Sequence, residues 1–453
     1  MSKFYSTNLE TSPVSFKEAL LKGLATDGGL YMPVEIPKLS ETELASLASD
    51  NYPSLATEVL GKLIGDEIER DELRNICEEI YTFDIPLEQI YDRNYLLRLD
   101  QGPTASFKDF AALFMGKIMQ YYLKAGNQFI TILTATSGDT GSAVANAFHD
   151  LDNIRVVILF PEGEVTDMQR KQMTTLGSNI TAAEIRGKFD DCQYLVKRAF
   201  MDRELLHLRL SSANSINIGR LLPQSVYYFW AWSRLASGSD EEVIFSVPCG
   251  NFGNLAGGII AREMGLPVKR FIIATNENDE VPEFLRTGEY IKIDPSLNCI
   301  SSAMNVGHPS NLARIIALYG GVMDEKGNIL KMPDLQKMNR DFYPVSVSDD
   351  HTRETIAKTF AKYKILTEPH GSVSWYGLQS YLDKYHNKTE EEGSICISLE
   401  TAHPAKFREE IIGILKFSPP EPESLLKIAG KKEEYISLDN NYDIFKEFLI
   451  KNY

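Results

Sequence analysis

From about residue 95 onward the chain alternates short apolar segments with longer helical ones, and this alternation constrains its fold most. Three of the apolar segments are 129–133, 243–247 and 395–399, and each runs directly into a loop rich in glycine, hydroxyl or amide side chains. Helical patterns follow over 143–148 and 255–264. Such alternation is typical of an α/β protein with open parallel sheets and flanking helices. Ligands of these folds bind beyond the carboxyl ends of the strands, so the three loops are the expected site.

The beginning of the chain, up to about residue 80, has a different and mostly helical pattern. Its apolar spacing predicts helices over 16–22, 41–49, 55–65 and 70–81. The end of the chain is rich in lysine and glutamate and carries an apolar stripe from Tyr442 to Leu449, which predicts an amphipathic surface helix. A chain of 453 residues is too long for one simple core, so two or three domains are expected.

Charge and cysteine content exclude several classes of protein. With 47 basic and 63 acidic residues the net charge is −16, which argues against non-specific nucleic-acid binding. The five cysteines are scattered without a CxxC pair, so neither a disulfide framework nor a zinc site is predicted. His308 and His403, each beside a proline, are predicted to be structural. Because no apolar run reaches the roughly 20 residues that span a bilayer and the first residues lack a signal peptide, we expect a cytoplasmic protein.

Lys108 stands where a loop is predicted to become a buried helix. Ser106 is a candidate N-cap, and Asp109 completes a variant of the capping box. A lysine in this first turn lies at the positive end of the helix dipole, and burial also disfavours its charge. A neutral amine is a nucleophile that can form a Schiff base with a carbonyl. For this lysine alone, a side chain that extends to water is the commoner alternative.

Gly250-Asn251-Phe252-Gly253-Asn254 is a glycine-bearing turn between an expected strand and an expected helix. The glycines allow close backbone approach, and free N–H groups at a helix start can cradle an anion such as a phosphate monoester. The segment matches neither the Walker A sequence nor the GxGxxG fingerprint. A turn that merely closes a strand–helix junction is the frequent alternative, and the two asparagines beside Phe252 favour the cradle.

Hydroxyl and basic side chains near the other strand ends are further candidates. Ser137 and Thr140 could receive a carboxylate or phosphate in a second strand-to-helix turn, for which a helix cap is an equally good explanation. Thr401 follows the third strand, where the simplest role is to cap a loop. The segment 214–220 alternates polar side chains with isoleucines, and Arg220 could hold a phosphate or a carboxylate.

The order of these features resembles the fold type II pyridoxal-phosphate enzymes, which are similar to the tryptophan synthase β subunit. The residues within these segments resemble those of the threonine synthase family more closely, and the matching segments extend over nearly the whole chain. They are 23–33, 106–109, 137–141, 250–254, 302–311 and 401–407. The resemblance implies an N-terminal domain over 1–85 and a catalytic region over 86–453. It implies that the catalytic region has a large and a small α/β domain with the active site between them.

The resemblance also implies a role for each candidate residue toward pyridoxal 5′-phosphate and the substrate. Lys108 would hold the cofactor as a Schiff base, and Thr401 would bond its ring nitrogen. Asp139 would lie near the 3′ oxygen of the cofactor. The implied phosphate loop of the cofactor is Gly250, Asn251, Phe252, Gly253 and Asn254. The implied substrate ligands are Ser137 and Thr140 for the α-carboxylate, with Ser215, Asn217, Arg220 and Lys406 as candidates for the phosphate.

The reaction implied is the conversion of O-phospho-L-homoserine and water to L-threonine and phosphate by γ-elimination and β-addition. The implied assembly is a monomer or a homodimer, and no metal is implied. A related phospholyase that releases 2-oxobutyrate, ammonia and phosphate shares the same motifs. A non-catalytic relative that binds a phosphate ligand is a third alternative, and Lys108 argues against it.

Two segments depart from the family pattern. Cys249 precedes the phosphate loop, where serine or glycine is expected, and Ser374-Trp375-Tyr376 is bulkier than the small residues expected there. Neither departure removes a residue that the chemistry needs.

Overall fold

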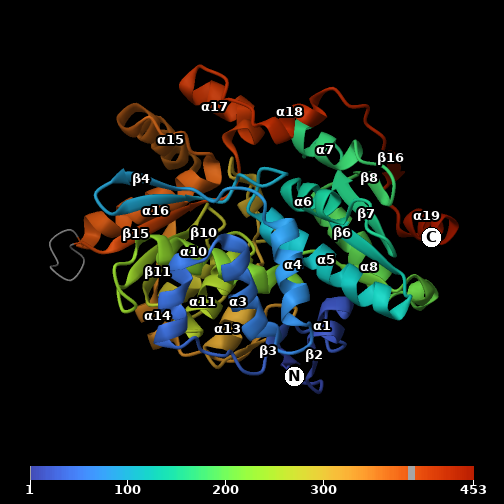
Figure 1. Cartoon of the computed structure of the whole chain (residues 1–453). Helices are drawn as coiled ribbons and strands as arrows, with labels where there is room; N and C mark the ends of the chain where they lie inside the picture. Colours follow the sequence, from blue (N-terminus) through green and yellow to red (C-terminus); the bar gives the residue numbers. More distant parts are fainter. Residues whose placement is uncertain (1, 386–392) are drawn as a thin grey trace.

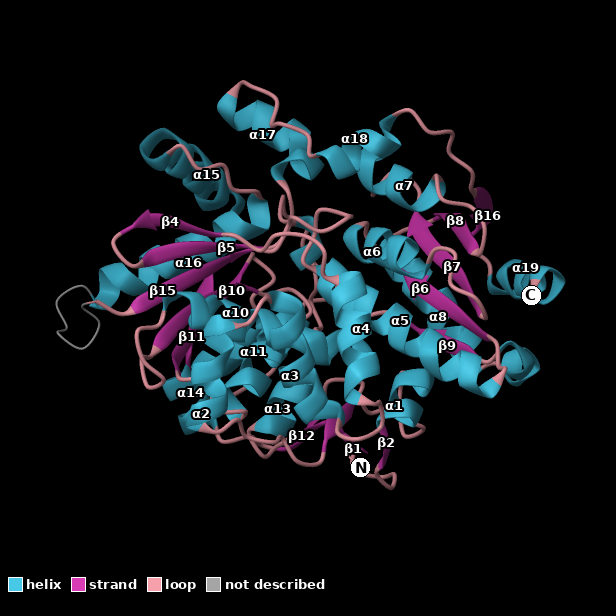
Figure 2. Cartoon of the chain, viewed as in Figure 1, coloured by secondary structure: helices cyan, strands magenta, loops and turns pink. Residues whose placement is uncertain are grey.

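The three apolar segments form strands β6 (Ile130–Ala135), β10 (Val243–Pro248) and β15 (Ile395–Glu400). They are seen in a computed structural model that describes residues 2–385 and 393–453. All residues of the three strands are buried, as expected for parallel strands covered by helices. β6 lies in one sheet, whereas β10 and β15 are neighbours in another (Figure 2). The predicted α/β class is therefore confirmed, with two sheets.

The first sheet has the strand order β14-β11-β10-β15-β5-β4. Its pairs are parallel except that β4 runs antiparallel to β5. One face packs on α16, where Ile244 and Ile272 join Trp375 in a buried cluster. The opposite face packs on α11, with Phe245 and Phe271 in the main core. The bounds of these elements are β4 (Leu87–Tyr91), β5 (Asn94–Arg98), β11 (Val268–Thr275), β14 (Phe342–Ser346), α11 (Gly253–Glu263) and α16 (Pro369–Tyr385).

The second sheet has the order β16-β8-β7-β6-β9, and its pairs are all parallel. Helices α5 and α6 lie on one face, and α8 and α19 lie on the other (Figure 1). The bounds are β7 (Ile154–Pro161), β8 (Ile180–Arg186), β9 (Leu210–Ser212), β16 (Ile436–Asp439), α5 (Lys108–Gly126), α6 (Asp139–Phe148), α7 (Asp167–Thr174), α8 (Phe189–Met201) and α19 (Tyr442–Asn452).

The beginning of the chain contains the four predicted helices and a small antiparallel sheet that was not predicted. The helices are α1 (Phe16–Lys22), α2 (Glu41–Ser46) with a 3-10 turn (Leu47–Ser49), α3 (Tyr52–Ile64) and α4 (Arg70–Ile80). The sheet has the order β2-β1-β3, from β1 (Lys3–Ser6), β2 (Val14–Ser15) and β3 (Tyr31–Pro33). The division at residue 85 remains a prediction.

Helix α5 is fixed against this N-terminal region close to its first residue, Lys108. The Tyr81 hydroxyl donates a hydrogen bond to the carbonyl oxygen of Phe110 over 2.9 Å. The Phe110 ring is fully buried, with its centroid 5.5 Å from those of Tyr52 and Tyr227. Edge-to-face aromatic pairs each contribute about 0.5–1.5 kcal/mol beyond their burial, so the first turn of α5 is held firmly.

The predicted capping box at the start of α5 is wrong. The Asp109 carboxylate accepts hydrogen bonds from the backbone N–H and the hydroxyl of Thr104, at 2.8 and 2.5 Å. The Ser106 hydroxyl accepts the N–H of Lys108 instead of that of Asp109. Thr104 competes successfully because the loop folds back over the first turn of the helix.

After β15 the chain crosses from the first sheet to the second. The crossing is formed by a 3-10 turn (Pro404–Phe407), α17 (Arg408–Leu415) and α18 (Glu423–Ala429), drawn at the top of Figure 1. The chain then adds β16 to the edge of β8 and ends in α19. The predicted amphipathic helix is confirmed, since Phe445 and Leu449 are buried while Ile444 is 41% exposed.

The remaining elements connect these layers. Pro223 lies in a 3-10 turn (Leu222–Ser225) between α9 (Ile218–Leu221) and α10 (Val226–Leu235). The others are α12 (Glu280–Thr287), α13 (Leu312–Leu318), β12 (Val322–Met323), β13 (Ile329–Lys331), α14 (Leu335–Asp341) and α15 (Asp349–Tyr363), with 3-10 turns at Arg203–Leu208 and Ser302–Met304. None of the helices in the described part of the chain has the length and apolar character needed to cross a membrane.

Candidate active site

The loop that carries Lys108 is joined directly to the end of strand β15. The N–H of Phe107 donates to the carbonyl oxygen of Thr401 over 2.9 Å, and Ser106 forms an isolated bridge with Ala402. The N–H of His403 donates to the carbonyl oxygen of Ala105 over 3.0 Å. These bonds bring the first turn of α5 beside Thr401, although about 290 residues separate them in the sequence.

The Lys108 amine lies in the environment that the sequence predicted. Its side chain is only 15% exposed, and its Nζ atom is 3.7 Å from the nearer carboxylate oxygen of Asp139. Burial lowers the pKa of Lys108 from its ordinary value, and the positive charges of Lys406 and Arg220 act in the same direction. The Asp139 charge opposes them only in part. Lys108 therefore loses its proton more easily than a surface lysine does, which gives a neutral, nucleophilic amine.

Asp139 is held as an anion between two lysines. Lys406 Nζ is 2.6 Å from one of its oxygens, and the Gln169 amide donates to the same oxygen over 3.0 Å. Although burial opposes ionisation, the nearby Lys406 and Lys108 charges and these hydrogen bonds hold the pKa of Asp139 well below its ordinary value. Lys406 also donates to the carbonyl oxygen of Thr104 over 3.0 Å, so its amine is fixed in this position.

The loop after β6 leaves two hydroxyl groups available to a ligand. The Thr136 hydroxyl accepts the N–H groups of Gly138 and Gly141, at 2.9 and 2.8 Å, so Thr136 caps the start of α6. Gly138 has a φ of +132°, and a Cβ atom there would collide with the Gln169 side chain. Ser137 and Thr140 are half-buried, and their hydroxyls form no hydrogen bond with the residues that the structure describes. The cap explanation for these two residues is therefore wrong.

The turn after β10 has the geometry of an anion cradle. Phe252 has a φ of +61°, and α11 starts immediately after it, so N–H groups at the helix start are exposed to the loop. The Asn254 carboxamide oxygen accepts the hydroxyls of Tyr227 and Tyr228, each at 2.7 Å. Its buried Nδ2 group has no partner among the described residues. A Cβ atom on Gly250 would lie 2.7 Å from the Cα atom of Met304, which requires glycine there.

Asn251 and Ser215 are brought together beside this turn. The Asn251 amide donates to the Ser215 hydroxyl over 2.6 Å, and its oxygen accepts the N–H of Ser310. Asn217 is not part of this group. Its amide donates to the carbonyl oxygens of Leu20 and Ser212, and its oxygen accepts the N–H of Gly219. The Asn217 side chain therefore caps α9 and ties it to α1.

Two arginines are buried in this region without a carboxylate partner among the described residues. Arg314 is fully buried and donates to four oxygen atoms of neutral groups, including the carbonyl oxygens of Ser215 and Ile216. Arg220 donates to the carbonyl oxygen of Ala213 over 2.8 Å, and its buried Nε has no partner in the described chain. Burial lowers the pKa of Arg220 to about 10 and that of Arg314 to about 9. Such uncompensated buried cations are expected to receive anionic ligands.

Sequence reasoning missed several residues that shape the site. Thr136 and Gln169 support Asp139 and its loop, but neither belongs to a motif. Arg314 carried a usable signal, because it is a single charge within the apolar segment 312–318 and follows Asn311 by three residues. Glu368 contacts Thr401 from 33 residues away and gave no sequence signal.

The two departures from the family pattern affect packing and leave the site intact. Cys249 is buried in the main core, and its Sγ donates to the carbonyl oxygen of Val247. Trp375 packs in the cluster between α16 and the first sheet, with its ring 6.2 Å from that of Tyr91. His403 accepts the N–H of Ala405 at the start of a 3-10 turn, and His308 contacts the Tyr290 hydroxyl, so both have the structural contacts predicted for them.

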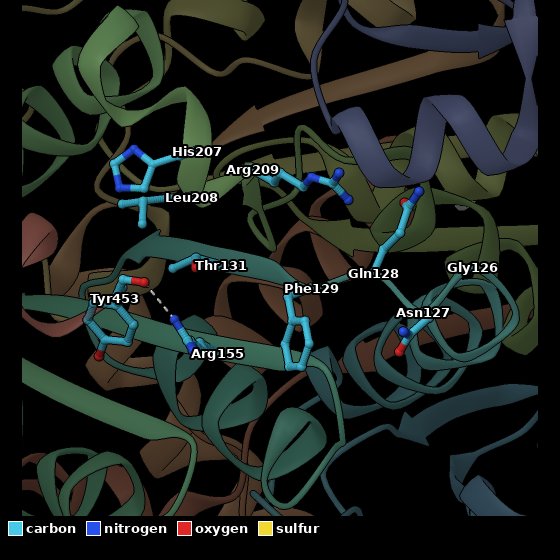
Figure 3. Close-up of a pocket in the computed structure, with 10 residues that line it drawn as sticks. All are labelled: Gly126, Asn127, Gln128, Phe129, Thr131, Arg155, His207, Leu208, Arg209 and Tyr453. Atoms are coloured by element: carbon cyan, nitrogen blue, oxygen red, sulfur yellow. Dashed lines mark hydrogen bonds between the residues drawn. The ribbon is translucent and has the colours of Figure 1, made fainter.

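A separate surface pocket of about 440 Å³ lies at the opposite end of the second sheet (Figure 3). It is lined by residues 126–129, which precede β6, by 207–209, which precede β9, and by Arg155 near the start of β7. Arg155 donates to the carbonyl oxygen of Tyr453 over 2.8 Å. Because ligands of parallel sheets bind at the carboxyl ends of the strands, this pocket is not the candidate site.

The pH dependence of amine labelling tests the assignment of Lys108. Since burial lowers its pKa, Lys108 becomes neutral as pH rises through a value below that of an ordinary lysine. Lys22 is a matched control, because its hydrogen bond to Glu18 raises its pKa. Reductive methylation followed by mass spectrometry should give a lower midpoint pH for Lys108 than for Lys22. Asp139→Asn should lower the Lys108 midpoint further, because the anion that favours the protonated amine is removed. A Lys108 midpoint at or above that of Lys22 would contradict the assignment.

Comparison with protein-family models covers the described site and nearly the whole chain. Residues 3–81 match the model of the threonine synthase N terminus, and residues 86–400 match that of pyridoxal-phosphate-dependent enzymes. Residues 380–449 match the model of the threonine synthase C-terminal region.

Known proteins give the same result. The chain is 40% identical to threonine synthase of Haemophilus influenzae over 99% of both chains, and 38% identical to that of Escherichia coli K12 over 94% of both. Among solved structures, pyridoxal-phosphate-bound threonine synthase from Brucella melitensis has a TM-score of 0.90 at 35% identity, over 99% of both chains. The Escherichia coli enzyme has a TM-score of 0.88 at 36% identity, over the full length of both. The chain therefore belongs to the threonine synthase family of pyridoxal-phosphate-dependent enzymes.

Proposed function

We propose that this chain converts O-phospho-L-homoserine and water to L-threonine and phosphate. The observation that carries the proposal is the pairing of a buried amine, whose pKa burial lowers, with buried arginines that lack a carboxylate partner among the described residues. Lys108 supplies the amine, and Arg220 and Arg314 supply the cations. A substrate with a carboxylate, an α-amino group and a phosphate satisfies all of these groups at once.

The residues fit pyridoxal 5′-phosphate as the cofactor. The turn at 250–254 would hold its phosphate, which would use the unpaired Asn254 Nδ2 and the space that a Cβ atom on Gly250 would fill. Lys108 would be attached to its carbonyl carbon, and Thr401 would face its ring nitrogen. When bound, the cofactor withdraws electrons from the substrate carbons and so makes their protons removable.

The substrate would be positioned by groups that the protein itself leaves unsatisfied. The free hydroxyls of Ser137 and Thr140 would bind the α-carboxylate. The unpaired Nε of Arg220 would bind the substrate phosphate, with Ser215 beside it. Lys406 is held in place by Asp139 and Thr104. We therefore assign it to the same phosphate-binding region, where it would supply a fixed positive charge. Asn217 uses its amide within the protein, and we assign it the support of α9.

The proton transfers would fall to Lys108. Once the substrate amino group has replaced it on the cofactor carbonyl carbon, the released Lys108 amine can accept the α-proton of the substrate, and it can then serve at Cβ and Cγ as the phosphate leaves. Asp139 remains ionised throughout, because Lys406 holds it, and it offsets positive charge at Lys108. Arg220 would stabilise the charge that develops on the departing phosphate, and water would add at Cβ.

We further propose that the protein works in a reducing compartment, the cytoplasm. None of its five cysteines forms a disulfide in the structure and all are buried, which suits such a compartment. We expect a monomer or a homodimer, which light scattering distinguishes.

Product analysis decides between the proposed reaction and simple phosphate elimination. With O-phospho-L-homoserine as substrate we expect threonine and phosphate in equal amounts. Lys108→Ala should lower kcat by about 10³-fold or more, because the proton carrier is removed. Formation of 2-oxobutyrate and ammonia as the main products would identify a phospholyase, and absence of turnover would contradict both reactions.

The cofactor cradle can be tested with two glycines of the same turn. Gly250→Ala should weaken pyridoxal-phosphate binding by about 10-fold or more, because its Cβ would lie 2.7 Å from Met304 Cα and displace the loop. Gly253→Ala is the matched control, since its Cβ would meet nothing nearer than 3.5 Å and the backbone N–H is retained. Cofactor titration monitored by absorbance measures both. Equal affinities for the two variants would argue against the cradle.

The proposed phosphate contact of Arg220 has its own test. Arg220→Ala should raise KM for O-phospho-L-homoserine by about 10- to 100-fold, the equivalent of a lost hydrogen bond to a charged group. The exposed Arg209 offers a control, because Arg209→Ala should leave KM unchanged. Cofactor affinity should persist in both variants. If KM is unaffected by Arg220→Ala, Arg220 does not bind the substrate phosphate.

A further inference from the structure

Two carboxyl groups are buried directly behind Thr401. Glu368, which precedes α16, and Glu400, the last residue of β15, are both completely buried. The N–H of Glu368 donates to one oxygen of Glu400 over 2.8 Å, so the two side chains belong to one polar cluster. The Thr401 hydroxyl donates to Glu368 Oε1 at 3.5 Å. Neither glutamate has a role in the reaction described above.

The hydrogen-bond donors around Glu368 are those that a carboxylate accepts. Its Oε2 accepts the backbone N–H of His370 at 2.7 Å, and its Oε1 accepts that of Gly371 at 2.9 Å. The His370 ring also contacts Oε2 through Nδ1 at 2.5 Å. His370 Nε2 accepts the N–H of Ala303, so the ring proton must lie on Nδ1 and point to Glu368. A group whose two oxygens both receive fixed N–H donors is a carboxylate.

Glu400 has the opposite character. Its Oε1 accepts the single N–H of Glu368, and its buried Oε2 has no partner among the described residues. Burial raises the pKa of Glu400 well above its ordinary value, and the negative charge of Glu368 adds to the effect. A second negative charge beside Glu368 is disfavoured in a buried site, and the positive charge of Arg98 offsets this only in part. Glu400 is therefore the protonated member and Glu368 the anionic member.

An anionic Glu368 determines the direction of the Thr401 hydroxyl. A threonine hydroxyl has one proton to donate, and here the carboxylate is the acceptor for it. The Thr401 oxygen then presents lone pairs to its other neighbours. A ring nitrogen that bonds to those lone pairs has to bring its own proton.

We propose that Glu368 is a positioning residue that acts through Thr401 to select the protonated form of the cofactor ring nitrogen. The inference rests on the role proposed above for Thr401. A neutral hydroxyl alone is a weak partner for a pyridinium nitrogen. A hydroxyl that donates to a buried carboxylate is a stronger acceptor, because charge-assisted bonds polarise their neighbours. The protonated ring is the better electron sink, which a reaction with successive proton removals from carbon requires.

The test uses the holoenzyme loaded with pyridoxal phosphate carrying ¹⁵N in the ring. The ¹⁵N resonance should fall in the range of a pyridinium nitrogen in the native protein. Glu368→Gln should move it toward that of an unprotonated pyridine, because the amide NH₂ can donate to Thr401 and turn the hydroxyl proton toward the ring. Glu400→Gln is the matched control, since it replaces a neutral carboxyl group by a neutral amide of similar shape and should leave the resonance in place.

Each outcome decides the proposal. An unprotonated ring nitrogen in the native holoenzyme overturns the proposal. This result needs no variant, so the proposal can be tested even if a variant fails to fold. Equal resonances for Glu368→Gln and the native protein also overturn it. Borohydride reduction followed by peptide mass spectrometry establishes separately whether the cofactor is attached to Lys108. Attachment elsewhere overturns the proposed function together with the relay, whereas attachment to Lys108 with an unprotonated nitrogen overturns the relay alone.

Discussion

The contact on which the rest of the site depends is the carboxylate of Asp139 between two buried lysine amines. Lys406 Nζ lies 2.6 Å from it and Lys108 Nζ lies 3.7 Å from it. These residues begin α6, lie in the turn after β15 and begin α5, so one anion ties together segments from both sheets. Removing one partner of such a buried pair costs about 3–5 kcal/mol, because an unpaired charge is left in a poor solvent. The ion pairs that balance charge in the site therefore also hold the two sheets together.

A strongly acidic protein nevertheless concentrates positive charge inside this site. Lys406 is satisfied by Asp139, but Arg220 and Arg314 are buried without a carboxylate among the described residues. The desolvation of these two guanidinium groups is offset in part by hydrogen bonds to neutral oxygens. The remainder would be recovered when phosphate groups bind. Because a ligand that binds only the folded protein stabilises it by mass action, cofactor and substrate would also stabilise the fold.

The sequence allowed the fold to be predicted where the signal was local. The helices around 16–22 and 70–80 followed from apolar spacing, and β6, β10 and β15 from short apolar runs before unusual loops. The two- to four-residue strands of the N-terminal sheet were not predictable, because their pairing depends on residues up to 30 positions away. The capping box at Ser106 failed for a related reason, since Thr104 competes for Asp109 within a folded loop. The loops of the candidate site could be predicted from their composition. Glu368 and Gln169 could not, because each acts through a residue distant in the sequence.

The site separates chemically similar groups by giving them unequal surroundings. Lys406 contacts Asp139 and a carbonyl oxygen closely, whereas Lys108 lies farther from Asp139, and burial lowers the pKa of Lys108. The same device recurs behind Thr401. Glu368 receives several N–H donors, whereas Glu400 receives one, and burial raises the pKa of Glu400. In this protein one pair would set the proton carrier, and the other would set the polarity of the hydroxyl that faces the cofactor ring.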